Sequence, residues 1–151
     1  MFKRMLLLSL TVSCLLLFTV SSAFAVQPLT TPPPQETQGI IEIESFRLLG
    51  GLECSIDQVG TAAKVFVTGN TTTQFDVDSL TVKIYLQRWT GSSWTDVAYK
   101  TYNASNDDYV SGSYSYTVPR GYYYRTQVYH FAKKGSIAES DYSYTSSIFI
   151  E

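Results

Sequence analysis

A strict alternation of apolar and polar side chains runs over residues 79–89 and limits the folds that this chain can adopt. One parity holds Leu80, Val82, Ile84 and Leu86, and the other holds Thr81, Lys83, Tyr85 and Gln87. Successive side chains of a β-strand point to opposite faces, so this period of two predicts a strand with one buried face. From residue 39 onward we find no convincing helical period, and we expect a core built from strands.

Similar runs recur at the spacing of an antiparallel sandwich or barrel. We expect further strands at residues 41–46, 52–56, 62–68, 94–101, 109–118, 121–132 and 142–150. Gly50 and Gly51 should separate the first two of these, and residues 69–78, which are rich in Thr and Asp, should form a loop. The sequence therefore predicts an all-β, antiparallel β-sandwich of about seven to eight strands.

The first 25 residues have the order of a secretory signal peptide. Lys3 and Arg4 precede an apolar run over residues 5–20, and small residues lead to Ala25. The apolar run is short for a membrane-spanning helix, which needs about 20 residues. We expect cleavage after Ala25, a secreted, extracellular protein, and membrane contact only through the cleaved segment. Cys14 lies inside the apolar run and not at its end, so lipid attachment there is the less favoured alternative.

Residues 26–38 hold four of the five prolines and very few apolar side chains. Such a segment is an extended spacer that cannot offset the entropy of its own ordering. We expect a disordered, proline-rich linker at residues 26–38 and a β-sandwich domain at residues 39–151. A proline-rich recognition motif is the alternative interpretation of the linker.

Charge and cysteine content exclude several classes of function. Signal-peptide removal leaves 9 basic and 13 acidic residues, a net charge of −4, and nucleic-acid binding requires a basic patch instead. It also leaves Cys54 as the one cysteine, so no disulfide can form within the chain. We expect Cys54 to be a small buried residue, and an intermolecular disulfide is the alternative.

Residues 118–130 resemble the corner between strands E and F of fibronectin type III and related immunoglobulin-like domains. Val118 is followed by Pro119 and Gly121, and Tyr124 stands six residues after Val118. The resemblance implies that Tyr124 is a structural tyrosine corner, whose hydroxyl bonds to nearby backbone. The chain also resembles small, Tyr-rich secreted proteins of Gram-positive bacteria that are grouped as families of unknown function, which implies no activity.

The residues favour no enzymatic chemistry, and we expect neither catalysis nor a cofactor. The single histidine, His130, has the inward parity of Tyr124 and is more typical of a hydrogen-bonded core residue than of a catalytic base. One His and one Cys make a zinc site unlikely to form. Acidic pairs at residues 76 and 78 and at residues 107 and 108 are a weak calcium signal, because they lack the density of a calcium loop.

The surplus of aromatic residues is the main functional signal, with 12 Tyr, 8 Phe and 2 Trp in the chain. The predicted binding face consists of Tyr85, Trp89, Tyr123, Arg125 and Tyr129, which share the outward parity of two strands. Rigid aromatics and Arg dominate binding hot spots, so this face would contact a protein or cell-surface partner. A carbohydrate or cell-wall module that uses Tyr85, Trp89 and Tyr129 is one alternative. A toxin-like or inhibitor protein that acts through its loops is another.

Overall fold

The computed structural model describes residues 26–35 and 46–151, and over these residues the chain forms eight β-strands and no helix. The strands are β1 (Leu49–Gln58), β2 (Lys64–Val77), β3 (Ser79–Trp89), β4 (Trp94–Ala104), β5 (Asp107–Thr117), β6 (Tyr122–Lys134), β7 (Ile137–Tyr144) and β8 (Ile148–Ile150). The all-β prediction is confirmed. The predicted signal peptide, and the predicted strand at residues 41–46 apart from its last residue, lie outside the described residues.

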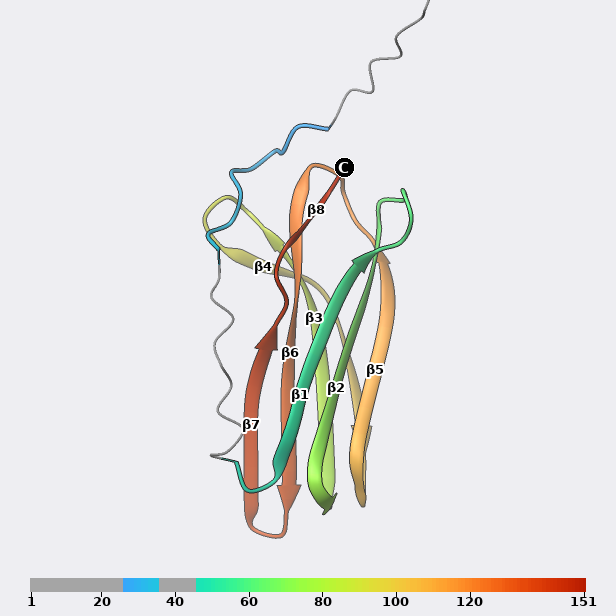
Figure 1. The fold of residues 1–151 in the computed structure, drawn as a ribbon, viewed down its shortest axis with the longest axis vertical. Helices are drawn as coiled ribbons and strands as arrows, with labels where there is room; N and C mark the ends of the chain where they lie inside the picture. Colours follow the sequence, from blue (N-terminus) through green and yellow to red (C-terminus); the bar gives the residue numbers. More distant parts are fainter. Residues whose placement is uncertain (1–25, 36–45) are drawn as a thin grey trace, which may run out of the picture.

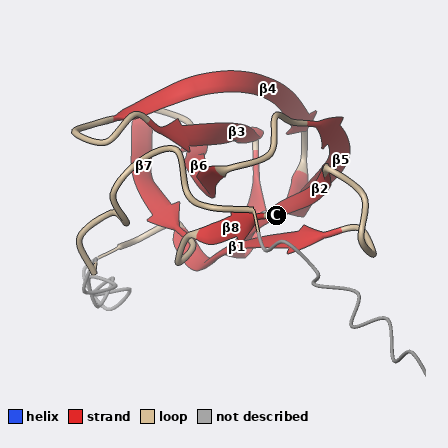
Figure 2. Ribbon diagram, turned by 90° about the horizontal axis from the view of Figure 1, so that it is seen from above, coloured by secondary structure: helices blue, strands red, loops and turns tan. Residues whose placement is uncertain are grey.

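The strands pair antiparallel in two sheets that pack face to face. The first sheet has the order β1-β2-β5 and the second has the order β4-β3-β6-β7. The short strand β8 pairs with the beginning of β6, beyond the stretch that β7 covers. The strands run along the long axis of the molecule (Figure 1), and the end-on view in Figure 2 shows them enclosing the core, with β4 curving over one side. Within the described ranges, no helix is long and apolar enough to cross a membrane.

Three details differ from the sequence prediction. The loop predicted at residues 69–78 is wrong, because β2 continues through this Thr-rich stretch and pairs with β1 and β5 on its two sides. Thr is β-branched and suits a strand, so its polarity misled the prediction. Gly50 and Gly51 lie inside β1, where the register shifts, and do not end it. The last predicted strand is two strands, β7 and β8, with residues 145–147 between them.

The core is filled by the inward parity of both sheets. All four apolar side chains of β3 that the alternation selects are buried: Leu80, Val82, Ile84 and Leu86. Val65, Val67 and Tyr114 meet them from the first sheet, and Tyr124 and Val128 add to the core from β6. Tyr116 has the same parity as the buried Tyr114 but is 43% exposed, because it lies on the edge strand β5 beside a hollow at β4.

Two contacts join the edges of the sheets and hold the second sheet in place. On one side, the ring of Tyr102 on β4 covers Gly112 on β5, and a Cβ at Gly112 would lie 2.1 Å from that ring. On the other side, the Glu139 carboxylate on β7 accepts the backbone N–H groups of Arg47 and Leu48 at 2.8 Å and of Leu49 at 3.2 Å. Burial opposes ionisation of Glu139, but these three N–H groups outweigh it and lower the pKa of its carboxyl.

Candidate functional site

The outer face of the second sheet carries the predicted binding residues together with several others. Its side chains come from one parity of β4, β3, β6, β7 and β8. We divide it into three parts. The tyrosine patch is Tyr85, Tyr99, Tyr129, Tyr142 and Tyr144; the polar network is Gln87, Asp96, Arg125 and Gln127; the aromatic row is Trp89, Trp94, Tyr123 and Phe149.

The tyrosine patch is a set of mutually supported but solvent-exposed rings. The ring centroids of Tyr85 and Tyr99 lie 5.8 Å apart, those of Tyr129 and Tyr142 lie 5.1 Å apart, and those of Tyr142 and Tyr144 lie 6.4 Å apart. Favourable aromatic pairs have centroids about 4.5–7 Å apart. Tyr99 is nevertheless 61% exposed and Tyr142 is 42% exposed, so the rings are ordered by their neighbours while their surfaces remain accessible.

Lys83 adds a positive charge to one side of the patch. Its ammonium nitrogen lies 4.3 Å from the ring centroid of Tyr99 and 4.8 Å from that of Tyr85. A cation over a ring face is attracted by the ring quadrupole. A hydrogen bond with Tyr85 is the main cause that raises the pKa of the Lys83 amine, which therefore stays charged over the two rings at neutral pH.

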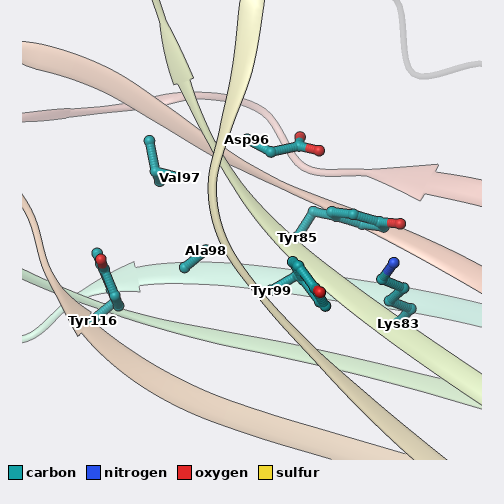
Figure 3. Close-up of a pocket in the computed structure, with 7 residues that line it drawn as sticks. All are labelled: Lys83, Tyr85, Asp96, Val97, Ala98, Tyr99 and Tyr116. Carbon is teal, nitrogen blue, oxygen red and sulfur yellow. The ribbon is translucent and has the colours of Figure 1, made fainter.

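A hollow of about 670 Å³ opens beside the patch along the edge strand β4. Figure 3 shows Lys83, Tyr85 and Tyr99 gathered on one side of it and Tyr116 standing apart on the other. The carboxylate of Asp96 also lines the hollow. The accessible tyrosine surface thus continues around the edge of the sheet into a concave, partly polar region.

Arg125 has the predicted outward parity, but its side chain is only 8% exposed. The guanidinium lies between the rings of Trp94 and Tyr144, 4.4 Å and 4.8 Å from their centroids, and its Nε–H donates to Gln87 Oε1 at 2.8 Å. The Gln87 amide in turn donates to Asp96 and to Gln127, each at 2.8 Å. Arg125 therefore supports the face from within, and the sequence-based expectation that it offers a contact surface needs correction.

Trp89 needs the same correction, because it is 7% exposed. Its ring packs against Trp94 with centroids 5.3 Å apart, and its indole Nε1–H donates to the carbonyl of Thr31 at 2.9 Å. Leu29 is also held, since its N–H donates to the Gly121 carbonyl at 2.7 Å. Residues 29–31 of the predicted linker thus lie against the domain, and Thr31 contacts Trp89, which the expected carbohydrate platform would need exposed.

Tyr85 and Tyr129 are the predicted residues that the structure places in the tyrosine patch, while Tyr123 packs against Phe149 in a tilted pair with centroids 5.0 Å apart. The prediction missed the other three members of the patch. Tyr142 and Tyr144 alternate with polar residues on β7, so their parity was readable once that strand was placed beside β6. Tyr99 was obscured because the β3–β4 register shifts between Leu86 and Gln87.

The hydrogen bond predicted for Tyr124 is present. Its side chain is fully buried, and its hydroxyl donates to the Pro119 carbonyl at 2.9 Å, which ties the start of β6 to the preceding turn. Desolvation by burial raises the pKa of Tyr124 to about 12, so the phenol stays protonated and able to donate.

His130 is a hydrogen-bonded core residue, as its parity indicates. The side chain has no exposed surface, with Nδ1 2.6 Å from Thr71 Oγ1 and Nε2 2.7 Å from Ser143 Oγ. Both hydroxyls can donate or accept, so either neutral tautomer is satisfied. Cys54 lies near Ser143, and burial raises the pKa of its thiol. A neutral, buried imidazole and a protonated thiol are suited to packing more than to nucleophilic chemistry.

The acidic pairs of the weak calcium signal lie at one end of the molecule, because Val77 pairs with Asp107. Asp78 Oδ2 accepts the Gly135 N–H at 2.7 Å, and Asp107 Oδ1 accepts the Asp108 N–H at 2.9 Å. In residues 26–35 and 46–151, no three His, Cys, Asp or Glu side chains gather as metal ligands would. The carboxylates of Asp78 and Asp107 therefore accept backbone N–H groups and stabilise the local chain.

The chain belongs to a family of unknown function (DUF6147), which matches residues 35–147. No curated protein matches the sequence. Among solved structures, CsgH of R. palustris is similar at 13% identity over 62% of this chain and 91% of its own, with a TM-score of 0.34. The E. coli curli protein CsgC is similar at 12% identity over 61% and 97% (TM-score 0.36), and a protein from Archaeoglobus fulgidus at 10% identity over 68% and 98% (TM-score 0.38). These likenesses are too distant to assign an activity, and the resemblance to Gram-positive proteins stays a prediction.

Proposed function

We propose that this member of a family of unknown function is a secreted, non-catalytic binding protein that contacts a protein or cell-surface partner through the tyrosine patch. The observation that carries the proposal is the set of five tyrosine rings, three exposed and two half-buried, that pack in pairs 5.1–6.4 Å apart across β3 and β4, across β6 and β7, and along β7. Tyr combines a rigid apolar body with a polar hydroxyl, so such a surface gains binding energy at a small cost in side-chain entropy. Exposed aromatic side chains gathered on one face are typical of an interaction site.

The layer beneath the patch supports the same proposal. Arg125, stacked between Trp94 and Tyr144 and bonded to Gln87, fixes the backbone and side chains of the surrounding strands. A surface that is ordered before binding loses less conformational entropy when a partner arrives. Such pre-organisation favours a binding face, whereas a sheet surface that only contacts solvent has no need of it.

As part of this proposal, we assign the fold to the immunoglobulin-like, fibronectin type III-like sandwiches. The strand order β1-β2-β5 in one sheet and β4-β3-β6-β7 in the other supports this assignment, and so does the bond from Tyr124 to Pro119. Secretion, with cleavage after Ala25, rests on the order of basic, apolar and small residues at the start of the chain. N-terminal sequencing of the exported protein should begin at Val26.

The experiment is a binding assay of fluorescently labelled protein to intact cells of the producing organism. Tyr99→Ala combined with Tyr142→Ala should weaken binding at least tenfold, because truncation of a hot-spot aromatic costs about 1–2 kcal/mol or more. Tyr109→Ala is the matched control, since Tyr109 is 47% exposed on β5 of the other sheet. Equal binding by the double variant and the wild type would refute the patch as the contact surface.

Pretreatment of the cells separates the classes of partner. Loss of binding after protease treatment identifies a protein partner, whereas loss after periodate oxidation identifies a glycan. The glycan alternative now depends on Tyr85 and Tyr129, because Trp89 is covered. Killing of cells by the purified wild-type protein and by the double variant alike would favour the toxin-like alternative, in which the loops engage the target.

A further inference from the structure

The proline-rich segment of residues 26–35, here called the arm, lies across one end of the second sheet (Figure 1). Two hydrogen bonds hold it there: Leu29 N–H donates to the Gly121 carbonyl at 2.7 Å, and the Trp89 indole donates to the Thr31 carbonyl at 2.9 Å. We call Trp89, Gly91 and Gly121 the cradle, because these three residues contact the arm. The polar network separates the cradle from the tyrosine patch, so the two are distinct surfaces.

The cradle leaves room for a backbone to approach closely. Gly91 and Gly121 have φ values of +99° and +83°, which favour glycine, and both lie in turns next to the arm. A Cβ at Gly121 would lie 2.9 Å from Cγ of Leu29, inside van der Waals contact. Thr30 lies over Gly91, where a Cβ would meet its side chain at 3.8 Å. The arm therefore sits on two turns whose geometry suits a bound chain.

The arm also has the chemistry of a recognised peptide. Pro32, Pro33 and Pro34 each have φ fixed near −65°, and each biases the residue before it toward an extended conformation. Thr31 is thus held extended, with its carbonyl free to accept a bond from outside the segment. In the docked arm the chain bends at Leu29 and Thr30, and the Thr31 carbonyl that follows bonds to one aromatic side chain, that of Trp89. Domains that bind proline-rich peptides likewise seat the peptide on aromatic side chains. Because the conformation is preset, little entropy is lost on binding.

The docking of the arm is incomplete. Thr30 Oγ1 is buried and, in the part of the chain that the structure describes, has no hydrogen-bond partner. A buried unsatisfied hydroxyl costs about 1–3 kcal/mol. Leu29, the largest apolar side chain of the arm, remains 65% exposed. The arm is therefore held by two specific hydrogen bonds while one of its hydroxyls is unsatisfied and its largest apolar side chain stays mostly exposed.

We propose that the cradle is a binding site for a peptide that bends just before a run of prolines, and that the arm of the same molecule is its resident, displaceable ligand. Specificity comes from the Trp89 indole and the Gly121 carbonyl, which bond to the peptide backbone at two points two residues apart. The buried hydroxyl of Thr30 keeps the arm from binding too tightly to be exchanged. This site accounts for the burial of Trp89, which the tyrosine patch does not use.

The first test measures how firmly the arm is docked in the full exported chain. Exchange of the Trp89 indole proton with solvent is followed by NMR, with the Trp94 indole as an internal reference. Thr30→Val has nearly the same shape but lacks the unsatisfied hydroxyl, so it should slow exchange of the Trp89 indole about five- to tenfold. Leu29→Pro removes the N–H that donates to Gly121 and should speed exchange, whereas Leu29→Ala keeps that N–H and should change it little.

The second test adds a synthetic peptide of residues 26–35 to the Leu29→Pro chain, whose own arm has lost its bond to Gly121 and so competes less for the cradle. The peptide should shift the Trp89 indole signal in a saturable way, and the peptide with Val in place of Thr30 should bind about five- to tenfold more tightly. Adding Trp89→Phe keeps a ring but removes the donor; followed through the Trp94 indole signal instead, peptide binding should weaken about three- to tenfold.

Three results would overturn the proposal. One is that the Trp89 indole proton exchanges at the wild-type rate in both Thr30→Val and Leu29→Pro. Another is the absence of saturable binding when the peptide is added at millimolar concentration to the Leu29→Pro chain. The third is a concentration-dependent dimer of the wild type, seen by sedimentation and abolished by Leu29→Pro, because the resident ligand would then be the arm of a second copy.

Discussion

Acidification should destabilise this protein through His130, the only histidine in the chain. The imidazole is fully buried between Thr71 and Ser143, and desolvation by burial lowers its pKa from 6.5 to about 4. The folded protein therefore keeps His130 neutral at pH 5, whereas the unfolded chain protonates it below about pH 6.5.

The sign and the size of the effect follow from proton binding. Between pH 6.5 and pH 4 the unfolded state binds more protons than the folded state, so the free energy of unfolding falls as the pH falls. The contribution of neutral His130 is complete above pH 6.5 and is lost by pH 4. The difference between the two pKa values corresponds to about 3 kcal/mol in all, of which about 2 kcal/mol is lost between pH 7 and pH 5.

Urea unfolding at pH 7, 6 and 5 measures this loss. With an m-value of about 1–3 kcal/mol per molar, the midpoint should fall by about 1 M over the two pH units. His130→Gln cannot titrate, so its midpoint should be lower at pH 7 but should vary much less with pH. The lower limit of pH 5 keeps most carboxyl groups ionised. A wild-type midpoint that is constant from pH 7 to pH 5, or an equal slope in His130→Gln, would refute the reasoning.

Three further predictions concern stability and are measured by thermal or urea unfolding. Tyr124→Phe should cost about 1 kcal/mol, because the bond to the Pro119 carbonyl is lost, whereas Tyr109→Phe on the exposed face of β5 should cost almost nothing. Gly112→Ala should cost about 1–3 kcal/mol, since its Cβ would collide with the Tyr102 ring at 2.1 Å; an unchanged midpoint would mean that the ring moves aside freely. Glu139→Gln should cost about 1 kcal/mol at pH 7, because an amide offers one acceptor atom where the carboxylate offers two, and the deficit should shrink as the wild-type carboxyl is protonated below pH 4.

The local sequence pattern predicted most of the strands because most strands here, such as β2, β3 and β6, have one buried face. The run from Ser79 to Trp89 coincides with β3, and its four apolar residues are all buried. The prediction failed where a polar stretch forms a strand. The Thr-rich half of β2 is a strand because it has a partner on both sides. For residues 69–77 the paired residues lie 15–24 positions away on β1 and 30–43 positions away on β5.

The candidate site could be predicted only in part, for a similar reason. Parity correctly placed Tyr85 and Tyr129 on the outer face, but parity states which side of a sheet a residue occupies and not what lies on top of it. Trp89 and Arg125 have the outward parity and are nevertheless buried, one beneath Thr31 and the other between two aromatic rings. The residues that cover Trp89 and Arg125 are not their neighbours in the sequence.

The sequence by itself determined that this is a strand-built protein, that β3 and β6 have defined inward faces, and that Tyr124 would bond to nearby backbone. These features depend on the period of the side chains and on a corner of a few residues, which are local properties. Only the tertiary structure decided which aromatics remain exposed and that the proline-rich arm docks on Trp89. Burial of an outward-facing side chain depends on contacts between distant segments, such as Thr31 with Trp89 across 58 positions, and no local pattern encodes them.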